Sequence, residues 1–162
     1  MSVHDRKNLK SALESAILYL QKQGVEEARQ DAWLLLEYVC GISHSTYFVH
    51  SEDEMPKEQQ EQYEALVRKR GEHIPLQQLT GEQEFMGLTF SVNEHVLIPR
   101  QDTEVLVEEV MKNLHDGFRI LDLCTGSGCI LLSLLHYSND CSGVGADLSE
   151  EALEVARKNA EQ

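Results

Sequence analysis

The architecture of this chain follows from one run of residues, Arg119-Ile120-Leu121-Asp122-Leu123-Cys124-Thr125-Gly126-Ser127-Gly128-Cys129-Ile130. An apolar segment too short for a helix ends at an acid and a loop of small residues, and apolar residues at helical spacing follow. This order predicts a strand, a tight turn and a helix. Glycines 126 and 128 allow positive φ and close ligand approach, and the helix start offers free N–H groups. We therefore expect the turn to bind a polar, nucleotide-like ligand.

A second strand is predicted at Gly143-Val144-Gly145-Ala146-Asp147. It places a carboxylate at its C-terminal end, 21 positions after Gly126. At that distance an acid can accept hydrogen bonds from both ribose hydroxyls of a nucleoside. The pattern thus predicts the start of an α/β sheet with a nucleoside site at the strand ends.

The loop departs from the dinucleotide fingerprint. That fingerprint has a third glycine three positions after the second, and Leu131 stands there. A nicotinamide-dependent oxidoreductase is therefore disfavoured, and a purely structural turn stays open. An acid followed by a small-residue loop instead resembles the first motif of S-adenosylmethionine-dependent methyltransferases, and Asp147 resembles their ribose-binding acid.

Composition indicates a soluble globular protein. The 162 residues are 41% hydrophobic and 26% charged, and no apolar run approaches the roughly 20 residues that span a bilayer. The first residues, Met1 to Arg6, lack the apolar core of a secretory signal, so we expect a cytoplasmic protein without a membrane partner. The scattered cysteines indicate reduced thiols rather than disulfides or a metal site; they are Cys40, Cys124, Cys129 and Cys141.

The net charge of −14 is unevenly distributed. Residues 1–80 carry 9 basic and 13 acidic side chains, whereas residues 81–162 carry 5 and 15. The acidic second half would repel nucleic acid, because basic side chains supply most non-specific affinity for phosphates. The expected partner is a protein or a small molecule, and the sequence does not fix an oligomeric state.

Residues 1–72 predict a small helical bundle. Apolar stripes at helical spacing run from Leu9 to Leu20 and from Ala28 to Val39, and Gly24 and Gly41 are placed to stop these helices. A short helix is predicted at residues 45–50. A fourth is predicted at residues 57–70, opened by Pro56 and closed by Gly71.

Residues 73–97 are predicted to be a connector that contains a β-hairpin, and residues 98–162 the first part of the sheet domain. Two short strands around a turn are indicated between Glu84 and Val92. Pro99 then ends an extended segment, and Asp102 or Thr103 is expected to cap the next helix.

Three blocks of sequence are distinctive: Pro75-Leu76-Gln77-Gln78-Leu79-Thr80-Gly81-Glu82-Gln83-Glu84-Phe85, Leu97-Ile98-Pro99-Arg100-Gln101-Asp102-Thr103-Glu104 and Asp122-Leu123-Cys124-Thr125-Gly126-Ser127-Gly128. Together they resemble the HemK-type N5-glutamine methyltransferases of peptide-chain release factors. The likeness covers the whole chain, and the order and spacing of the blocks fit. The family implies an N-terminal bundle, a Rossmann-like class I methyltransferase sheet, S-adenosylmethionine as donor, and a class 1 release factor methylated on the glutamine of its Gly-Gly-Gln motif.

The resemblance also implies site residues. Asp147 would hold the ribose hydroxyls, and Asp122 would support the loop and meet the amino group of the donor. The loop main chain would wrap the methionine portion; it comprises Cys124, Thr125, Gly126, Ser127 and Gly128. The substrate entrance would be lined by Arg100, Asp102, Thr103 and Glu104, for which helix capping and a surface ion pair are the alternatives.

The chain departs from the family pattern in three respects. Gln101 stands where the family usually has proline, and Cys124 where it usually has glycine, which is strained by roughly 1 kcal/mol if the turn needs positive φ there. Cys124 as a methyl-accepting nucleophile would need nearby cations, and none is close in sequence. The catalytic Asn-Pro-Pro-Tyr segment does not occur. We therefore expect part of a longer enzyme, inactive alone; a non-catalytic module that docks on a release factor is the alternative.

Overall fold

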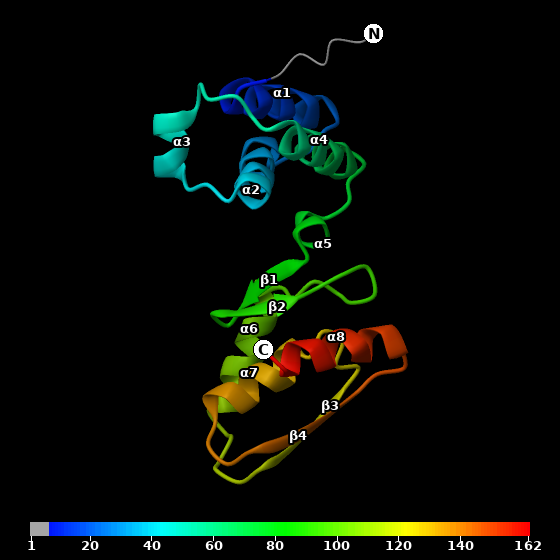
Figure 1. Cartoon of the computed structure of the whole chain (residues 1–162). Coiled ribbons are helices and arrows are strands. Elements are labelled where there is room, and N and C mark those ends of the chain that lie inside the picture. The colour runs from blue at the N-terminus through cyan, green and yellow to red at the C-terminus, as the bar shows by residue number, and fades with distance from the viewer. Residues whose placement is uncertain (1–6) are drawn as a thin grey trace. The chain divides into compact units, whose positions relative to one another are not determined.

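The computed structural model describes residues 7–162. The described chain divides into a helical unit that ends at Thr80 and an α/β unit that begins at Gly81 (Figure 1). The helical unit contains α1 (Leu9–Lys22), α2 (Ala28–Cys40), α3 (His44–His50), α4 (Lys57–Gly71) and α5 (Leu76–Thr80). The second unit contains β1 (Glu82–Phe85), β2 (Leu88–Ser91), α6 (Gln101–Met111), β3 (Arg119–Leu123), α7 (Cys129–Tyr137), β4 (Ser142–Ala146) and α8 (Glu150–Ala160).

The apolar stripes of α1, α2 and α4 build the core of the bundle, as the sequence predicted. Gly24 and Gly41 adopt left-handed conformations directly after α1 and α2, which confirms them as helix stops. The Tyr63 hydroxyl donates a hydrogen bond to the Ala32 carbonyl oxygen (2.9 Å), and burial raises the pKa of Tyr63. The core side chains include Leu9, Ile17, Leu20, Ala32, Trp33, Leu35, Leu36, Met55, Tyr63 and Val67.

Gly71 ends α4 where the sequence placed the end, but for a different physical reason. It is the last helical residue and is buried, and a Cβ added there would lie 2.6 Å from Tyr19 Cε1. The absent side chain therefore lets α1 and α4 approach each other closely. The left-handed conformation that follows the helix falls instead on His73, at φ 65°.

The helix α5 was not predicted, and the boundary between the two units lies within the segment predicted to be the connector. Periodicity cannot indicate a five-residue helix that begins directly after Pro75. Leu76 and Leu79 of α5 pack against the bundle core, whereas the hairpin belongs to the second unit. The segment 73–97, predicted to be one connector, is thus divided between the two units.

The second unit combines an antiparallel hairpin with a parallel strand pair. In the hairpin, Phe85 pairs with Leu88 around the turn at Met86 and Gly87. The β3–α7–β4 segment forms a parallel pair in which Leu121 lies opposite Val144, so the predicted strand–turn–helix–strand order is confirmed. The core of the second unit contains the buried side chains of Phe85, Phe90, Val107, Cys129 and Leu134.

The start of α6 differs from the expected capping. The helix begins at Gln101 with Arg100 at the N-cap position, and no side chain of that residue caps it. Asp102 and Thr103 are therefore not caps but lie within the first turn. There the carboxylates of Asp102 and Glu104 complement the positive end of the helix dipole.

Among residues 7–162, no helix is both long enough and apolar enough to cross a membrane.

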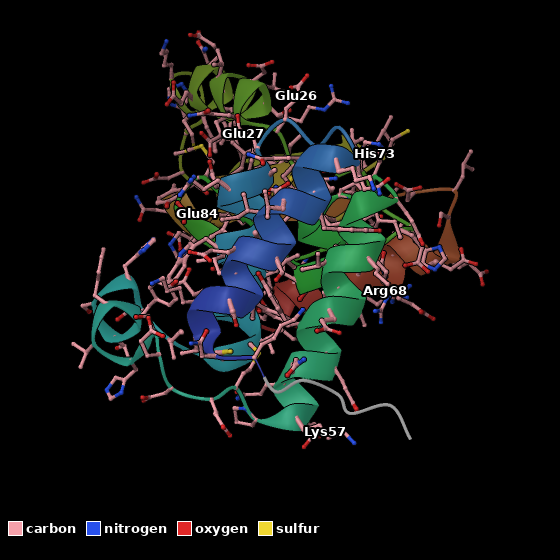
Figure 2. The ribbon with its side chains drawn as sticks, turned by 90° about the horizontal axis from the view of Figure 1, so that it is seen from above. Glu26, Glu27, Lys57, Arg68, His73 and Glu84 are labelled. Atoms are coloured by element: carbon pink, nitrogen blue, oxygen red, sulfur yellow. The ribbon has the colours of Figure 1, made fainter. Side chains whose placement is uncertain are left out.

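A buried ion pair joins α2 to α4 in the bundle. Arg70 Nε donates to Asp31 Oδ2 at 2.7 Å, and both side chains are largely buried, 18% and 9% exposed. Arg70 also donates to the carbonyl oxygen of Ile74. Figure 2 labels Lys57 at the start of α4 and Arg68 toward its C-terminal end. Arg68 is exposed to solvent. Breaking the pair would leave the carboxylate of Asp31 buried without its counter-ion.

Replacement of Arg70 by methionine is therefore expected to lower the free energy of unfolding of the bundle by about 3 kcal/mol. The matched control is Lys69→Met, an exposed neighbour, with an expected change within about 0.5 kcal/mol. Urea denaturation followed by the fluorescence of Trp33, the single tryptophan, measures both. Adding Asp31→Leu to Arg70→Met should recover most of the loss; equal losses in the Arg70 and Lys69 variants would contradict this account.

Candidate functional site

Residues Cys124–Gly128, here called the glycine loop, reverse the chain between β3 and α7. Three of its five residues adopt left-handed conformations: Cys124 at φ 62°, Gly126 at φ 56° and Gly128 at φ 79°. Such conformations are cheap for glycine and strained for other residues. The loop therefore turns tightly enough for the N-terminal end of α7 to lie beside the end of β3.

Thr125 holds the glycine loop against both strands. Its hydroxyl donates to Asp122 Oδ2 on β3 at 2.6 Å, and its N–H donates to the Ala146 carbonyl oxygen at the end of β4 at 3.0 Å. A Cβ added at Gly145 would lie 3.0 Å from Thr125 Oγ1, so the absent side chain of Gly145 makes room for the threonine. Asp122 thus holds Thr125 of the loop, while its contact with the amino group of a donor stays a prediction.

Asp147 follows β4 and reaches the glycine loop from the second strand. Asp147 Oδ2 accepts from the Gly126 N–H (2.9 Å), and Oδ1 accepts from the Ser149 N–H (3.1 Å). These two backbone donors, Ser149 first, lower the pKa of Asp147. The carboxylate is therefore ionised at neutral pH, and each oxygen keeps a further lone pair that can accept a hydroxyl.

The two cysteines at this site differ in environment. Cys124 is exposed and has the left-handed conformation that the sequence analysis identified as the condition for strain. Cys129 is buried at the first position of α7, and burial raises the pKa of its thiol. Cys129 therefore serves as a small apolar side chain of the core rather than as a thiolate.

Among the four residues predicted to line an entrance, Glu104 has a structural partner. Glu104 Oε1 accepts from the Met86 N–H at 2.6 Å, and the Tyr137 hydroxyl donates to the Met86 carbonyl oxygen at 2.6 Å. The hairpin turn, where Met86 has φ 53°, is thus held by α6 and α7. Arg100 and Asp102 are exposed and Thr103 is half-buried. An entrance role for these residues stays a prediction.

Asn159 is a site residue that the sequence analysis missed. Its side chain is buried and bonds to main-chain atoms of Ser127 in the glycine loop and Ser91 in β2. The available signal was its place in the apolar stripe of α8, in line with Ala152 and Val155. A polar residue at such a position is buried only with hydrogen-bond partners.

Among residues 7–162, no cluster of three or more His, Cys, Asp or Glu side chains could hold a metal ion.

Comparison with known proteins gives the same family as the motifs. Residues 11–81 match the PrmC N-terminal domain, which falls on the helical unit and the first residue of the second unit. The family resemblance is thereby confirmed. Curated relatives named release factor glutamine methyltransferase occur in Moorella thermoacetica (41% identical over 154 residues), Escherichia coli (39% over 142) and Staphylococcus aureus (34% over 155).

These alignments extend well beyond the helical unit. They cover 94%, 87% and 96% of this chain, but 54%, 51% and 55% of the respective relatives. The chain thus spans about half the length of the curated relatives it matches. Because the helical unit accounts for only about half of residues 1–162, the similarity necessarily includes a large part of the α/β unit.

Replacement of Cys124 should reveal the cost of its left-handed conformation. We expect Cys124→Gly to be more stable than Cys124→Ala by about 1 kcal/mol, because only the alanine keeps a Cβ at φ 62°. Urea denaturation followed by far-ultraviolet circular dichroism measures this difference, while Trp33 fluorescence reports the bundle separately. Equal stabilities of the two variants would show that the turn carries no strain at this position.

The lowered pKa of Asp147 has a consequence for acid stability. A carboxyl whose folded-state pKa lies below its unfolded value stabilises the fold above the unfolded pKa, and this contribution is lost as the pH falls through the folded pKa. The contribution of Asp147 to the free energy of unfolding of the second unit should therefore be constant above about pH 5 and fall as the pH is lowered below it. In Asp147→Asn the free energy of unfolding should fall less steeply, measured by urea denaturation across this range. Identical slopes would contradict the assignment of Asp147 as an anchored carboxylate.

Proposed function

We propose that residues 81–162 form the donor-binding portion of a Rossmann-like class I methyltransferase that uses S-adenosylmethionine. The observation that carries the proposal is the contact between the Asp147 carboxylate and the Gly126 N–H, which joins the ends of two parallel strands. It places an ionised acceptor pair beside a loop of main-chain N–H groups at the start of a helix. The names of the relatives support the reaction class.

In this proposal the substrate is a class 1 release factor, methylated on the glutamine amide of its Gly-Gly-Gln motif. The helical unit would recognise the release factor, in a protein located in the cytoplasm. Its match to the N-terminal domain of a release factor methyltransferase family supports this assignment. The second unit, with 15 acidic and 5 basic side chains, is poorly suited to bind nucleic acid directly.

The described residues would bind and orient the donor. The Asp147 oxygens would accept hydrogen bonds from the two ribose hydroxyls. The existing bond from the Gly126 N–H to Asp147 Oδ2 would keep the glycine loop beside this carboxylate. Asp122 would act through Thr125, because its Oδ2 already accepts the threonine hydroxyl. When bound, S-adenosylmethionine supplies an electrophilic methyl group on a sulfonium.

The acceptor side of the reaction needs further groups. The lone pair of an amide nitrogen is delocalised into the carbonyl, so the glutamine must be oriented in line with the methyl–sulfur bond and shielded from water. In the family this role belongs to an Asn-Pro-Pro-Tyr segment, which does not occur in residues 1–162. We therefore expect these residues alone to bind donor without transferring the methyl group.

A second candidate function is a docking module without donor binding. The observation that favours it is the independence of the helical unit, which has its own core and its own buried ion pair. In that case the bundle would bind a release factor and the second unit would only support it. The two candidates differ in one measurable property, the affinity for the donor.

Calorimetric titration with S-adenosylhomocysteine measures that property. We expect the chain to bind this product, and Asp147→Asn to bind at least about tenfold more weakly because one charged acceptor becomes a neutral amide. The matched control is Glu150→Gln, which also removes one negative charge. Glu150 is exposed to solvent and lies three residues after Asp147. Its affinity should be unchanged.

The outcomes separate the candidates. Absence of binding by a chain that is folded by circular dichroism would overturn the donor-binding proposal. Capture of a purified class 1 release factor by that same chain would then favour the docking module. An equal loss of affinity in the Asp147 and Glu150 variants would instead indicate that overall charge, and not the ribose contact, governs binding.

A further inference from the structure

The side-chain amide of Asn159 joins three segments that are distant in sequence. Asn159 Nδ2 donates to the Ser127 carbonyl oxygen at 2.8 Å and to the Ser91 carbonyl oxygen at 3.0 Å. Its Oδ1 accepts from the Ser91 N–H at 2.7 Å. The side-chain amide of Asn159 on α8 therefore bonds to both the N–H and the carbonyl oxygen of Ser91 in β2, and also to the glycine loop.

The bond to Ser127 acts on one particular peptide plane. The carbonyl of the Ser127–Gly128 peptide accepts from Asn159, and the N–H of the same peptide donates to the Thr125 carbonyl oxygen at 2.8 Å. The plane is thus held from both sides and cannot rotate without losing a hydrogen bond. Because Gly128 has φ 79°, this plane also sets the direction in which α7 leaves the loop.

Close packing of α8 keeps the amide in place. A Cβ added at Gly128 would lie 3.3 Å from the Ala156 Cβ, so the helix approaches the loop main chain directly. Asn159 is 8% exposed and Ser127 is 2% exposed, so water does not readily replace the bond between them. The neighbouring Gly126 N–H is the group that Asp147 Oδ2 binds.

We propose that Asn159 is a positioning residue for the donor site, which it controls through the Ser127 carbonyl without touching the ligand. This inference rests on the proposed function of the glycine loop. Rotation of the Ser127–Gly128 plane would break the bond from the Gly128 N–H to the Thr125 carbonyl oxygen and shift Gly126 relative to Asp147. The link to Ser91 fixes Asn159 itself, because it uses the remaining donor and the acceptor of the amide.

Asn159→Asp is the sharpest variant. It keeps the size and the acceptor for the Ser91 N–H, but its ionised form donates nothing and its protonated form can donate to only one of the two carbonyl oxygens. We expect its affinity for S-adenosylhomocysteine to fall at least about tenfold in calorimetric titration. If Asn159→Asp does not fold by circular dichroism, Asn159→Ser, uncharged and too short to reach Ser127, carries the same expectation.

The matched control is Gln162→Ala. Gln162 Nε2 donates to Ser91 Oγ at 3.1 Å, so this variant also removes a bond between the C-terminal segment and β2, but none to the glycine loop. Its donor affinity should equal that of the unchanged chain. Hydrogen exchange gives a second readout: the Gly128 N–H should exchange faster in Asn159→Asp, while the amides paired between β1 and β2 keep their protection.

Each outcome decides the inference. Selective loss of affinity and of Gly128 protection in Asn159→Asp supports it. Binding by the unchanged chain together with full affinity in a folded Asn159→Asp would overturn the inference and leave the proposed function standing. Uniform loss of protection across the second unit with unchanged affinity would show a merely structural role. Failure of the unchanged chain to bind would overturn the proposed function and this inference with it.

Discussion

The reversal of the chain within the glycine loop is the constraint on which the second unit depends. Five residues carry the chain from β3 into α7, and three of them take left-handed conformations to do so. The reversal brings α7 back along the strand pair, so β4 can add in parallel beside β3. Without it, neither the parallel register nor the meeting of Asp122 and Asp147 at one end of the sheet would arise.

Two carboxylates, Asp122 and Asp147, hold the glycine loop at that end of the strand pair. Asp122 lies within β3, and its bond to the buried Thr125 hydroxyl fixes the inner side of the loop. Asp147 stands just beyond β4 and holds the outer side through Gly126. Both carboxylates are half-buried; Asp122 accepts one side-chain hydrogen bond from Thr125, and Asp147 accepts two main-chain hydrogen bonds, one on each oxygen.

Local patterns predicted most of the fold, and the remainder depends on contacts between distant residues. Apolar stripes and glycine stops located the long helices, because amphipathic spacing and left-handed caps are properties of short segments. The packing role of Gly71 depends on Tyr19, 52 positions earlier in the chain, and that of Glu104 on Met86. Asn159 contacts Ser91 across 68 positions. Such partners leave no periodic signal in a single sequence.

The prediction of the candidate site shows the same division. Asp122, Asp147 and the glycine loop were found because a strand end, a small-residue loop and a second acid follow one another at a characteristic spacing. The strain at Cys124 could be named only as a condition, since φ depends on how the turn closes on β4. The failure of Asp102 and Thr103 to cap α6 has a comparable cause. Pro99 is buried, and the helix begins directly after Arg100.

Side-chain hydrogen bonds to the main chain hold the glycine loop at the end of the β3–β4 pair. Leu121, Leu123 and Val144 are 63%, 67% and 59% exposed, although parallel sheets are normally covered on both faces. At the strand ends, Asp147 and Asn159 bond to the main chain of the loop. Because a lost buried hydrogen bond costs about 1–3 kcal/mol, a few such contacts are enough to hold the loop in one conformation.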